Sequence, residues 1–286
     1  MDVTTVRLKS WNEIHGYAQQ GWVYRGQSSE AWPLITSLER RVKRFNVPLE
    51  KRADLEQRLI REFKRAYHQY SSRIPPDDAV VEWLSLMQHH GAPTRLLDFT
   101  YSIYVAAYFA LESAEGDSAV WAVNAPWAVQ ESSRLLDASG KVDARLATKP
   151  VTEENEGLAA NWFFEAPALR LTYPANPFRL NERLRIQRGL FLLPGDVAQT
   201  FEENLCGMPD YSNPQHVVRF VLPENLRLQA LKELFAMDIA RSSLFPGLDG
   251  YAQSLGVYHS AYYPTDWEGK ADPMPLPDCD SPHERK

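Results

Sequence analysis

Cysteine is scarce in this chain of 286 residues: only Cys206 and Cys279 occur, far apart and neither within a CxxC. This scarcity argues against a disulfide framework and against a zinc site built on paired cysteines. Long apolar runs are also missing, because no stretch approaches the roughly 18 apolar residues of a membrane span. The opening MDVTTVRLKSW has no apolar core of signal-peptide length. We therefore expect a cytoplasmic protein with no membrane partner.

The chain has no excess of positive charge. Its formal net charge is −6, which gives no support for an electrostatic grip on nucleic acid or anionic lipid over the whole surface. Lys and Arg are concentrated at 39–45 and 51–65, but glutamates are interleaved there, so we interpret these segments as solvated helix faces. GxGxxG, GxxxxGK[ST], GxSxG and HExxH are all missing, and no common nucleotide-loop, serine-hydrolase or zinc-protease motif supports a function.

Apolar periodicity predicts an α+β fold, with short mixed or antiparallel strands and several packing helices, because the elements show no regular βαβ alternation. Helices are predicted at 6–20, 49–70, 79–90, 102–113 and 225–238, with a helical turn at 181–188 and a further helix within 244–258. Strands are predicted at 22–26, 118–124, 169–174, 189–195 and 216–223. The segment 33–42 fits either a helix or irregular structure.

We expect one domain over 1–260. The polar, irregular stretch 126–165 is an insertion or a lid within it, although short helices are also compatible with the pattern. From 261 to 286 the chain is rich in proline and predicts a flexible tail.

The first candidate site group is WVYRGQ at 22–27. Arg25 ends a short strand and precedes Gly26, so a rigid guanidinium fork lies where a ligand can approach the backbone closely. Such a fork suits a diphosphate or a carboxylate. The alternative is a buried arginine paired with a core acid, for which Asp98 is the obvious partner.

The second group is QHHGAPTRLLDFT at 88–100. His89 and His90 lie on the last turn of a predicted helix and point about 100° apart, so they are a poor metal pair and no metal site is expected. One of them can bond a main-chain carbonyl, and the other is a candidate ligand contact.

The rest of this stretch forms the connection to the next helix. Leucines and a phenylalanine would anchor a loop whose polar side chains point into a cavity, as is common where sites lie. These polar residues are Thr94, Arg95, Asp98 and Thr100. Either Thr100 or Ser102 could cap the following helix. The alternative is a satisfied buried polar network that joins helix to loop. A third candidate, Gln187 in RIQRGLF, is a weak base and better suited to orienting a hydroxyl group.

These segments together resemble the FRG domain, a family named for an aromatic-Arg-Gly motif. The resemblance covers about 22 to 258 and rests on YRGQ (24–27), WPL (32–34), MQHHGAPTRLLDFT (87–100), AAYFA (106–110), QRGLF (187–191) and LFPGLDG (244–250). Many members have tyrosine and tryptophan where this chain has His90 and Phe99, which makes His89 the more important histidine.

A strand ending in YRG, followed by a threonine or serine ahead of an A-A-x-F-A helix, also looks similar to the ADP-ribosyltransferase pattern. This resemblance implies that Arg25 holds the NAD phosphates, Thr100 shapes the nicotinamide-ribose pocket and Gln187 contacts ribose or acceptor. The glutamate of that pattern is missing, and Asp98 and Glu165 are the carboxylates that could replace it.

Our hypothesis is an ADP-ribosyltransferase-like enzyme that binds NAD or a related nucleotide and acts on an unknown acceptor, a protein or a nucleic acid. By analogy with stand-alone bacterial enzymes, it would be a toxin or an anti-phage effector. The expected catalytic residues are Gln187, Asp98 and His89; the expected ligand contacts are Arg25, Gly26, Gln27, Arg95 and Thr100. Two alternatives stay open: a non-catalytic binding or interaction module, and a metal-independent nuclease using His89 with Arg95.

Overall fold

The computed structural model describes residues 1–140 and 168–261, and side chains as far as residue 255. The predicted Pro-rich tail from 262 onward, most of the predicted insertion and Glu165 lie outside these residues. In the described ranges, no helix is both long and apolar enough to cross a bilayer.

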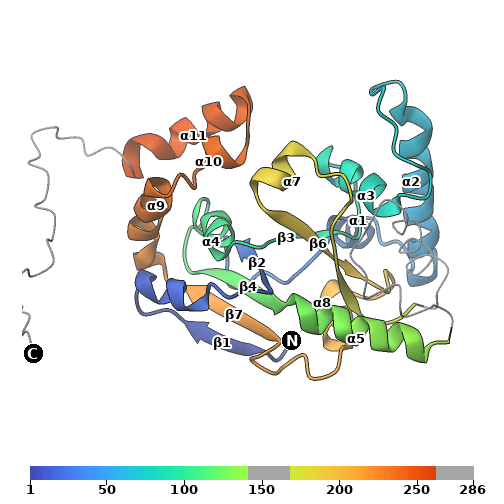
Figure 1. The fold of residues 1–286 in the computed structure, drawn as a ribbon, viewed down its shortest axis with the longest axis horizontal. Coiled ribbons are helices and arrows are strands. Elements are labelled where there is room, and N and C mark those ends of the chain that lie inside the picture. Colours follow the sequence, from blue (N-terminus) through green and yellow to red (C-terminus); the bar gives the residue numbers. More distant parts are fainter. Residues whose placement is uncertain (141–167, 262–286) are drawn as a thin grey trace, which may run out of the picture.

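The centre of the fold is an open seven-stranded sheet in the order β1-β7-β4-β2-β3-β6-β5 (Figure 1). β1 and β7 are parallel, and every other neighbouring pair is antiparallel. The strands are β1 (Thr4–Arg7), β2 (Trp22–Gln27), β3 (Leu97–Thr100), β4 (Ser118–Asn124), β5 (Thr172–Ala175), β6 (Gly189–Pro194) and β7 (Val217–Leu222). The fold is α+β with a mixed, mostly antiparallel sheet, which confirms the predicted class.

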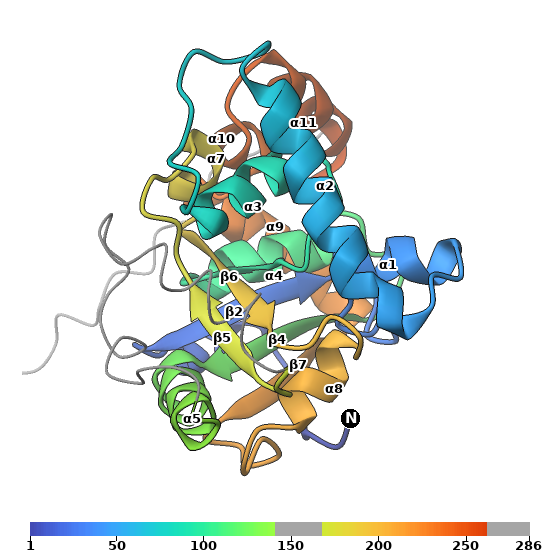
Figure 2. The ribbon, with the colours of Figure 1, turned by 90° about the vertical axis from the view of Figure 1, so that its right-hand side faces the viewer.

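Helices cover both faces of the sheet. In Figure 2, α5 and α8 lie on one side of the strands and α4 and α9 on the other. The α-helices are α1 (Ser37–Arg44), α2 (Arg52–Tyr67), α3 (Val80–His89), α4 (Ile103–Leu111), α5 (Ala125–Ala138), α7 (Glu182–Ile186), α8 (Phe201–Cys206), α9 (Arg227–Ala236), α10 (Arg241–Leu244) and α11 (Leu248–Ala261). Three short 3-10 helices are η1 (Trp11–Tyr17), η2 (Leu49–Lys51) and η4 (Glu224–Leu226).

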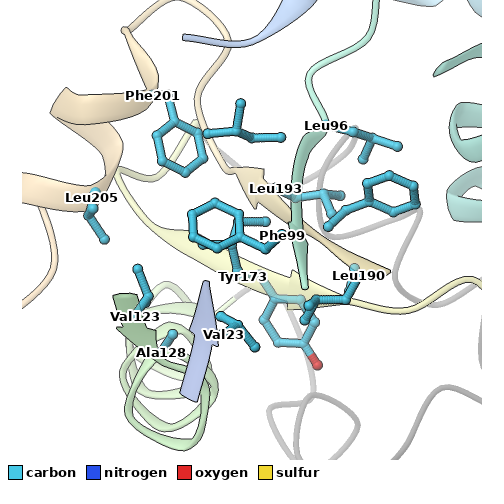
Figure 3. Close-up of a cluster of buried hydrophobic side chains, with 14 of the residues drawn as sticks. Val23, Leu96, Phe99, Val123, Ala128, Tyr173, Leu190, Leu193, Phe201 and Leu205 are labelled. Carbon is cyan, nitrogen blue, oxygen red and sulfur yellow. The ribbon is translucent and has the colours of Figure 1, made fainter. Parts of the chain in front are cut away.

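Two hydrophobic clusters hold the helices to the sheet. The larger one, shown in Figure 3, joins β2 to β6 with α5 and α8, and α2 and α3 contribute to it as well. Its labelled members are Val23, Leu96, Phe99, Val123, Ala128, Tyr173, Leu190, Leu193, Phe201 and Leu205. The second cluster packs α4, α9 and η1 against the other face of β2, β4 and β7. Side chains alternate along β2, with Val23 in the first cluster and Tyr24 in the second, because successive strand residues point to opposite faces.

The sheet is nearly divided at its middle. β2 pairs with β4 along its whole length, from Trp22 to Gln27, and β3 pairs along its whole length with β6. Between β2 and β3 themselves, only Tyr24 and Thr100 pair. Beyond that rung the two strands diverge, so the second half of β2 and the first half of β3 leave a gap in the sheet.

Several predicted elements are confirmed, and three are wrong. The predicted helix over 6–20 is instead the end of β1 followed by η1, because Val6 and Arg7 pair with β7 at the other end of the chain. The connecting loop expected before residue 101 contains β3, which pairs with β6. Both elements depend on partners more than 80 residues away, which local periodicity does not report.

The third correction concerns a helix, and two open predictions are resolved. Residues 125–138 form α5, in a segment for which the sequence left helices open. The helix predicted within 244–258 starts at Leu248, and α10 ends before it at Leu244, so Pro246 lies between two helices rather than in a first turn. Helix α1 begins within the ambiguous 33–42 segment and continues to Arg44, and Thr36 caps it by accepting a hydrogen bond from the Glu39 amide.

Candidate ligand-binding cleft

A cavity of about 220 Å³ lies where β2 and β3 diverge. β2, β3, α4 and α7 supply its walls, and all four are labelled in Figure 1. The lining residues are Tyr24, Arg25, Gly26, Asp98, Phe99, Thr100, Phe109, Arg183 and Gln187. The gap in the sheet is therefore hollow.

Arg25 crosses this gap. Its Nη1 donates to the main-chain carbonyl of Asp98 at 2.8 Å, a group that a continuous β2–β3 ladder would have engaged. The Nε is buried and has no hydrogen-bond partner among the described residues. Burial lowers the pKa of Arg25, the Asp98 charge opposes that shift, and Arg40 adds to it. The expected alternative of a core ion pair is wrong in this form, because Arg25 bonds the Asp98 carbonyl while the Asp98 side chain is exposed.

Gly26 brings α4 against β2. A Cβ at this position would lie 1.9 Å from the carbonyl oxygen of Ala106, so only glycine permits this approach. We expected Gly26 to let a ligand approach the backbone. Gly26 lines the cavity, but the feature that requires glycine here is the close packing of α4 against β2.

Gln27 and Arg95 do not line the cleft, which corrects their expected role as ligand contacts. Gln27 is buried, and its amide accepts from Trp121 Nε1 at 2.8 Å and donates to the Pro33 carbonyl at 2.9 Å. Arg95 is 2% exposed, and its Nε donates to both oxygens of Glu56 at 2.8 and 3.0 Å. Both are polar residues satisfied in the interior.

Thr100 and Gln187 do line the cavity, but they bond one another and their neighbours. The Thr100 hydroxyl donates to the Gln187 carbonyl at 2.7 Å and accepts from the Ser102 amide at 3.0 Å. Ser102, not Thr100, caps α4. The Gln187 side chain donates to the Leu244 carbonyl at 3.1 Å. These contacts hold both residues at the cleft floor and leave the Thr100 hydroxyl with little capacity for a ligand.

A second, smaller cavity of about 100 Å³ adjoins the first and shares Asp98, Arg183 and Gln187 with it. Its other lining residues are Ser85, Gln88, His89, Asn181, Leu184 and Phe191. We refer to the two as the Arg25 cavity and the His89 cavity. Asp98 and Arg183 stand at their junction, on opposite elements, β3 and α7.

Gln88, which the sequence analysis did not single out as a site residue, holds Asp98. Its Nε2 donates to the Asp98 carboxylate at 2.9 Å, while its Oε1 accepts from the Thr94 hydroxyl at 2.6 Å. Because a hydroxyl donor occupies the carbonyl end, the amide must present its NH₂ to Asp98. The polar-network alternative is therefore correct for Thr94, and this network positions the one carboxylate of the cleft.

Arg183 was also missed. It is an exposed residue on α7, and its guanidinium lies 4.5 Å from the ring centre of Phe245. Arg241 lies 4.6 Å from the same ring and pairs with Glu112. Desolvation lowers the pKa of Arg183, and the Asp98 charge opposes the shift. No local signal separates Arg183 from the other arginines of its segment, because its position depends on Phe245, 62 residues further along the chain.

Both histidines are exposed, but His89 lines the smaller cavity whereas His90 lies outside both linings. The two rings meet edge-on at 4.9 Å. Desolvation lowers the pKa of His89, and the neighbouring His90 and Arg183 lower it further. In the described part of the chain, no three His, Cys, Asp or Glu side chains gather closely enough to hold a metal ion.

The charges in the cleft favour an anionic ligand. Arg25 and Arg183 face the Arg25 cavity, and the field of Arg40 reaches Arg25. Asp98 is the single carboxylate in either lining. Low-dielectric walls around two guanidinium groups strengthen their attraction for phosphate or carboxylate oxygens.

Comparison with known proteins assigns part of the chain. The FRG domain family matches residues 20–119, which contain Arg25, the 88–100 motif and α4. No curated protein and no solved structure gave a match. The family match ends before α7, so Arg183 and Gln187 lie outside it. The chain therefore carries an FRG domain over residues 20–119.

Proposed function

We propose that the Arg25 cavity binds NAD or a related nucleotide and that the protein is an ADP-ribosyltransferase-like enzyme. The observation that supports this most is the buried, unpartnered Nε of Arg25 in the gap between β2 and β3. A buried guanidinium nitrogen without a partner is costly, and a phosphate oxygen would satisfy it. Arg183 supplies a second guanidinium on the facing wall, as a diphosphate requires.

The remaining lining suits the other parts of a nucleotide. Phe109 offers aromatic surface beside Arg25. Asp98 is exposed in the cleft and fixed by Gln88, so its carboxylate can stabilise positive charge on a ribose carbon as the bond to nicotinamide breaks. In that step the electron pair of the C–N bond leaves with nicotinamide. Asp98 takes the place of the glutamate that is missing from the ADP-ribosyltransferase pattern.

A bacterial toxin or anti-phage role stays part of this proposal by analogy only. The nuclease alternative loses support, because Arg95 is paired with Glu56 in the interior and cannot act beside His89. The binding-module alternative differs from the enzyme in one outcome, which is binding of NAD without release of nicotinamide.

The test is calorimetric titration of NAD into the full chain, followed by mass spectrometry for nicotinamide. Arg25→Ala and Arg183→Ala should each weaken NAD binding at least tenfold, whereas Arg185→Ala, on the same helix as Arg183 but outside the linings, should not. Binding with no nicotinamide after hours would leave a binding module. NAD binding that Arg25→Ala leaves unchanged would remove the proposed site.

A further inference from the structure

The proposed binding of the nucleotide phosphates takes place in the Arg25 cavity and leaves the His89 cavity free. The His89 cavity lies on the far side of Asp98 and Arg183 from Arg25, and its walls come from the end of α3 and the start of α7. Since both cavities meet at Asp98, a group in the smaller one faces any ribose carbon that Asp98 stabilises. This arrangement is that of two subsites around one reacting centre.

The His89 cavity is small and polar. About 100 Å³ corresponds to roughly three times the liquid volume of one water molecule, so it admits a terminal group of a larger molecule, not a whole one. His89, Gln88 and Asn181 line it with side chains that hydrogen-bond. Gln88 is already committed to Asp98 and Thr94. The ionisable residues of this lining are His89, Asp98 and Arg183, and since Asp98 is assigned to the ribose carbon, His89 is left to accept a proton.

The charge of the cleft selects among nucleophiles. Arg183 borders the cavity and Arg25 lies beyond it, against the single carboxylate of Asp98. A protonated lysine or an arginine side chain would meet net positive charge. A carboxylate nucleophile would need no base. A neutral hydroxyl group is attracted by neither sign and needs a proton acceptor, which is what His89 can be.

We propose that the His89 cavity receives a hydroxyl-bearing acceptor and that His89 takes its proton. This inference rests on the proposed function of the Arg25 cavity. The hydroxyl oxygen forms a bond to the ribose carbon, and the bond from that carbon to nicotinamide breaks with its electron pair. The hydroxyl proton passes to an imidazole nitrogen of His89 and then to solvent. The products are nicotinamide and an O-glycoside of ADP-ribose, with no oxidant or metal required.

The state of His89 agrees with this role. No hydrogen bond of its ring is among the contacts of the described residues, and its pKa is lowered by desolvation, His90 and Arg183. These effects favour the neutral imidazole, which has a lone pair for a proton. Two other charged residues line the same cavity, Asp98 from β3 and Arg183 from α7.

The test uses methanol as the probe hydroxyl. The full chain is incubated with NAD in buffered water containing methanol, and ADP-ribose and methyl ADP-ribose are quantified by mass spectrometry from pH 5 to 9. The ratio of methyl ADP-ribose to ADP-ribose should exceed the mole ratio of methanol to water. The rate of methyl ADP-ribose formation should rise with pH and then level off. His89→Gln should reduce that rate at least tenfold and abolish the pH-dependent limb, while NAD affinity by calorimetry changes less than threefold. His90→Gln is the matched control: it should keep the rate and the pH-dependent limb, with the midpoint moved to higher pH because His90 no longer lowers the pKa of His89.

The outcomes separate the two proposals. If NAD is bound and cleaved but His89→Gln keeps both the rate and the pH limb, His89 is not the proton acceptor and this inference is overturned alone. If the ratio of methyl ADP-ribose to ADP-ribose only equals the mole ratio of methanol to water, the cavity does not select a hydroxyl acceptor. If the unchanged chain binds no NAD, the proposed function fails and takes this inference with it.

Discussion

The Arg95 guanidinium and the Glu56 carboxylate form a buried ion pair that ties α2 to the segment before β3, with both side chains almost inaccessible. Removing one partner of such a pair leaves an uncompensated charge in the interior. Glu56→Ala should therefore lower the free energy of unfolding by roughly 3–5 kcal/mol, measured by urea denaturation. Replacing both, as Glu56→Leu with Arg95→Met, should recover most of that loss. A double variant as unstable as Glu56→Ala would show that the pair itself, not the orphaned charge, carries the stability.

The Gln88–Thr94 hydrogen bond should be measurable as a coupling energy. Thr94 is fully buried, and its hydroxyl loses its acceptor in Gln88→Leu. We expect Gln88→Leu to cost about 1–3 kcal/mol, because a buried donor is left unsatisfied. Thr94→Val should cost less in this background than in the unchanged chain, although the Leu96 amide loses its bond to Thr94 in both. Urea denaturation of the four proteins of the cycle gives the coupling, and strict additivity would contradict the network.

Gly26→Ala should be among the most damaging single changes. Its Cβ would collide with the Ala106 main chain, so β2 and α4 must move apart. Such overpacking against backbone should cost about 3 kcal/mol or more. Gly16→Ala is the control, because a Cβ there meets nothing within 4 Å, and it should change stability by less than about 1 kcal/mol. Thermal unfolding of both variants compares them directly, and equal midpoints would mean that α4 does not pack this closely.

Tyr173 should make stability fall in alkali. Burial raises its pKa to about 12 from 10.0. The unfolded chain loses this proton from pH 10 upward while the folded chain keeps it. The stabilisation is therefore complete below pH 10 and is lost as the pH rises to 12. At about 1.36 kcal/mol per unit, the loss reaches up to roughly 2–3 kcal/mol. Urea denaturation at pH 9 and 11.5 should show a smaller drop for Tyr173→Phe than for the unchanged chain, and an equal drop would contradict the assignment.

The sequence predicted much of the fold because most elements carry their own periodicity. β4 is found at its predicted bounds, and α2, α3, α4 and α9 lie within theirs. β1 and β3 were missed because each has only four residues and is defined by pairing with a distant strand. Length and partner, not composition, decide such short strands.

The site was only partly predictable for a similar reason. Arg25 and Asp98 belong to motifs that indicate a site, and the structure brings both to one cleft with His89 beside it. Arg95 has the same chemistry as Arg25 but meets Glu56 in the core. Arg183 enters the cleft through packing against Phe245. Which arginine faces a cavity is settled by tertiary contacts that a single sequence does not display.

The single rung between Tyr24 and Thr100 makes the sheet two panels joined at one point. The panel of β1, β7, β4 and β2 carries Arg25, and the panel of β3, β6 and β5 carries Asp98. A molecule that binds to both sides of the gap would hold the two panels in a fixed relative position. Binding of this molecule would then slow amide hydrogen exchange in β3 and β6 far more than in β4. The ligand could therefore be detected by the reduced exchange in one half of the sheet.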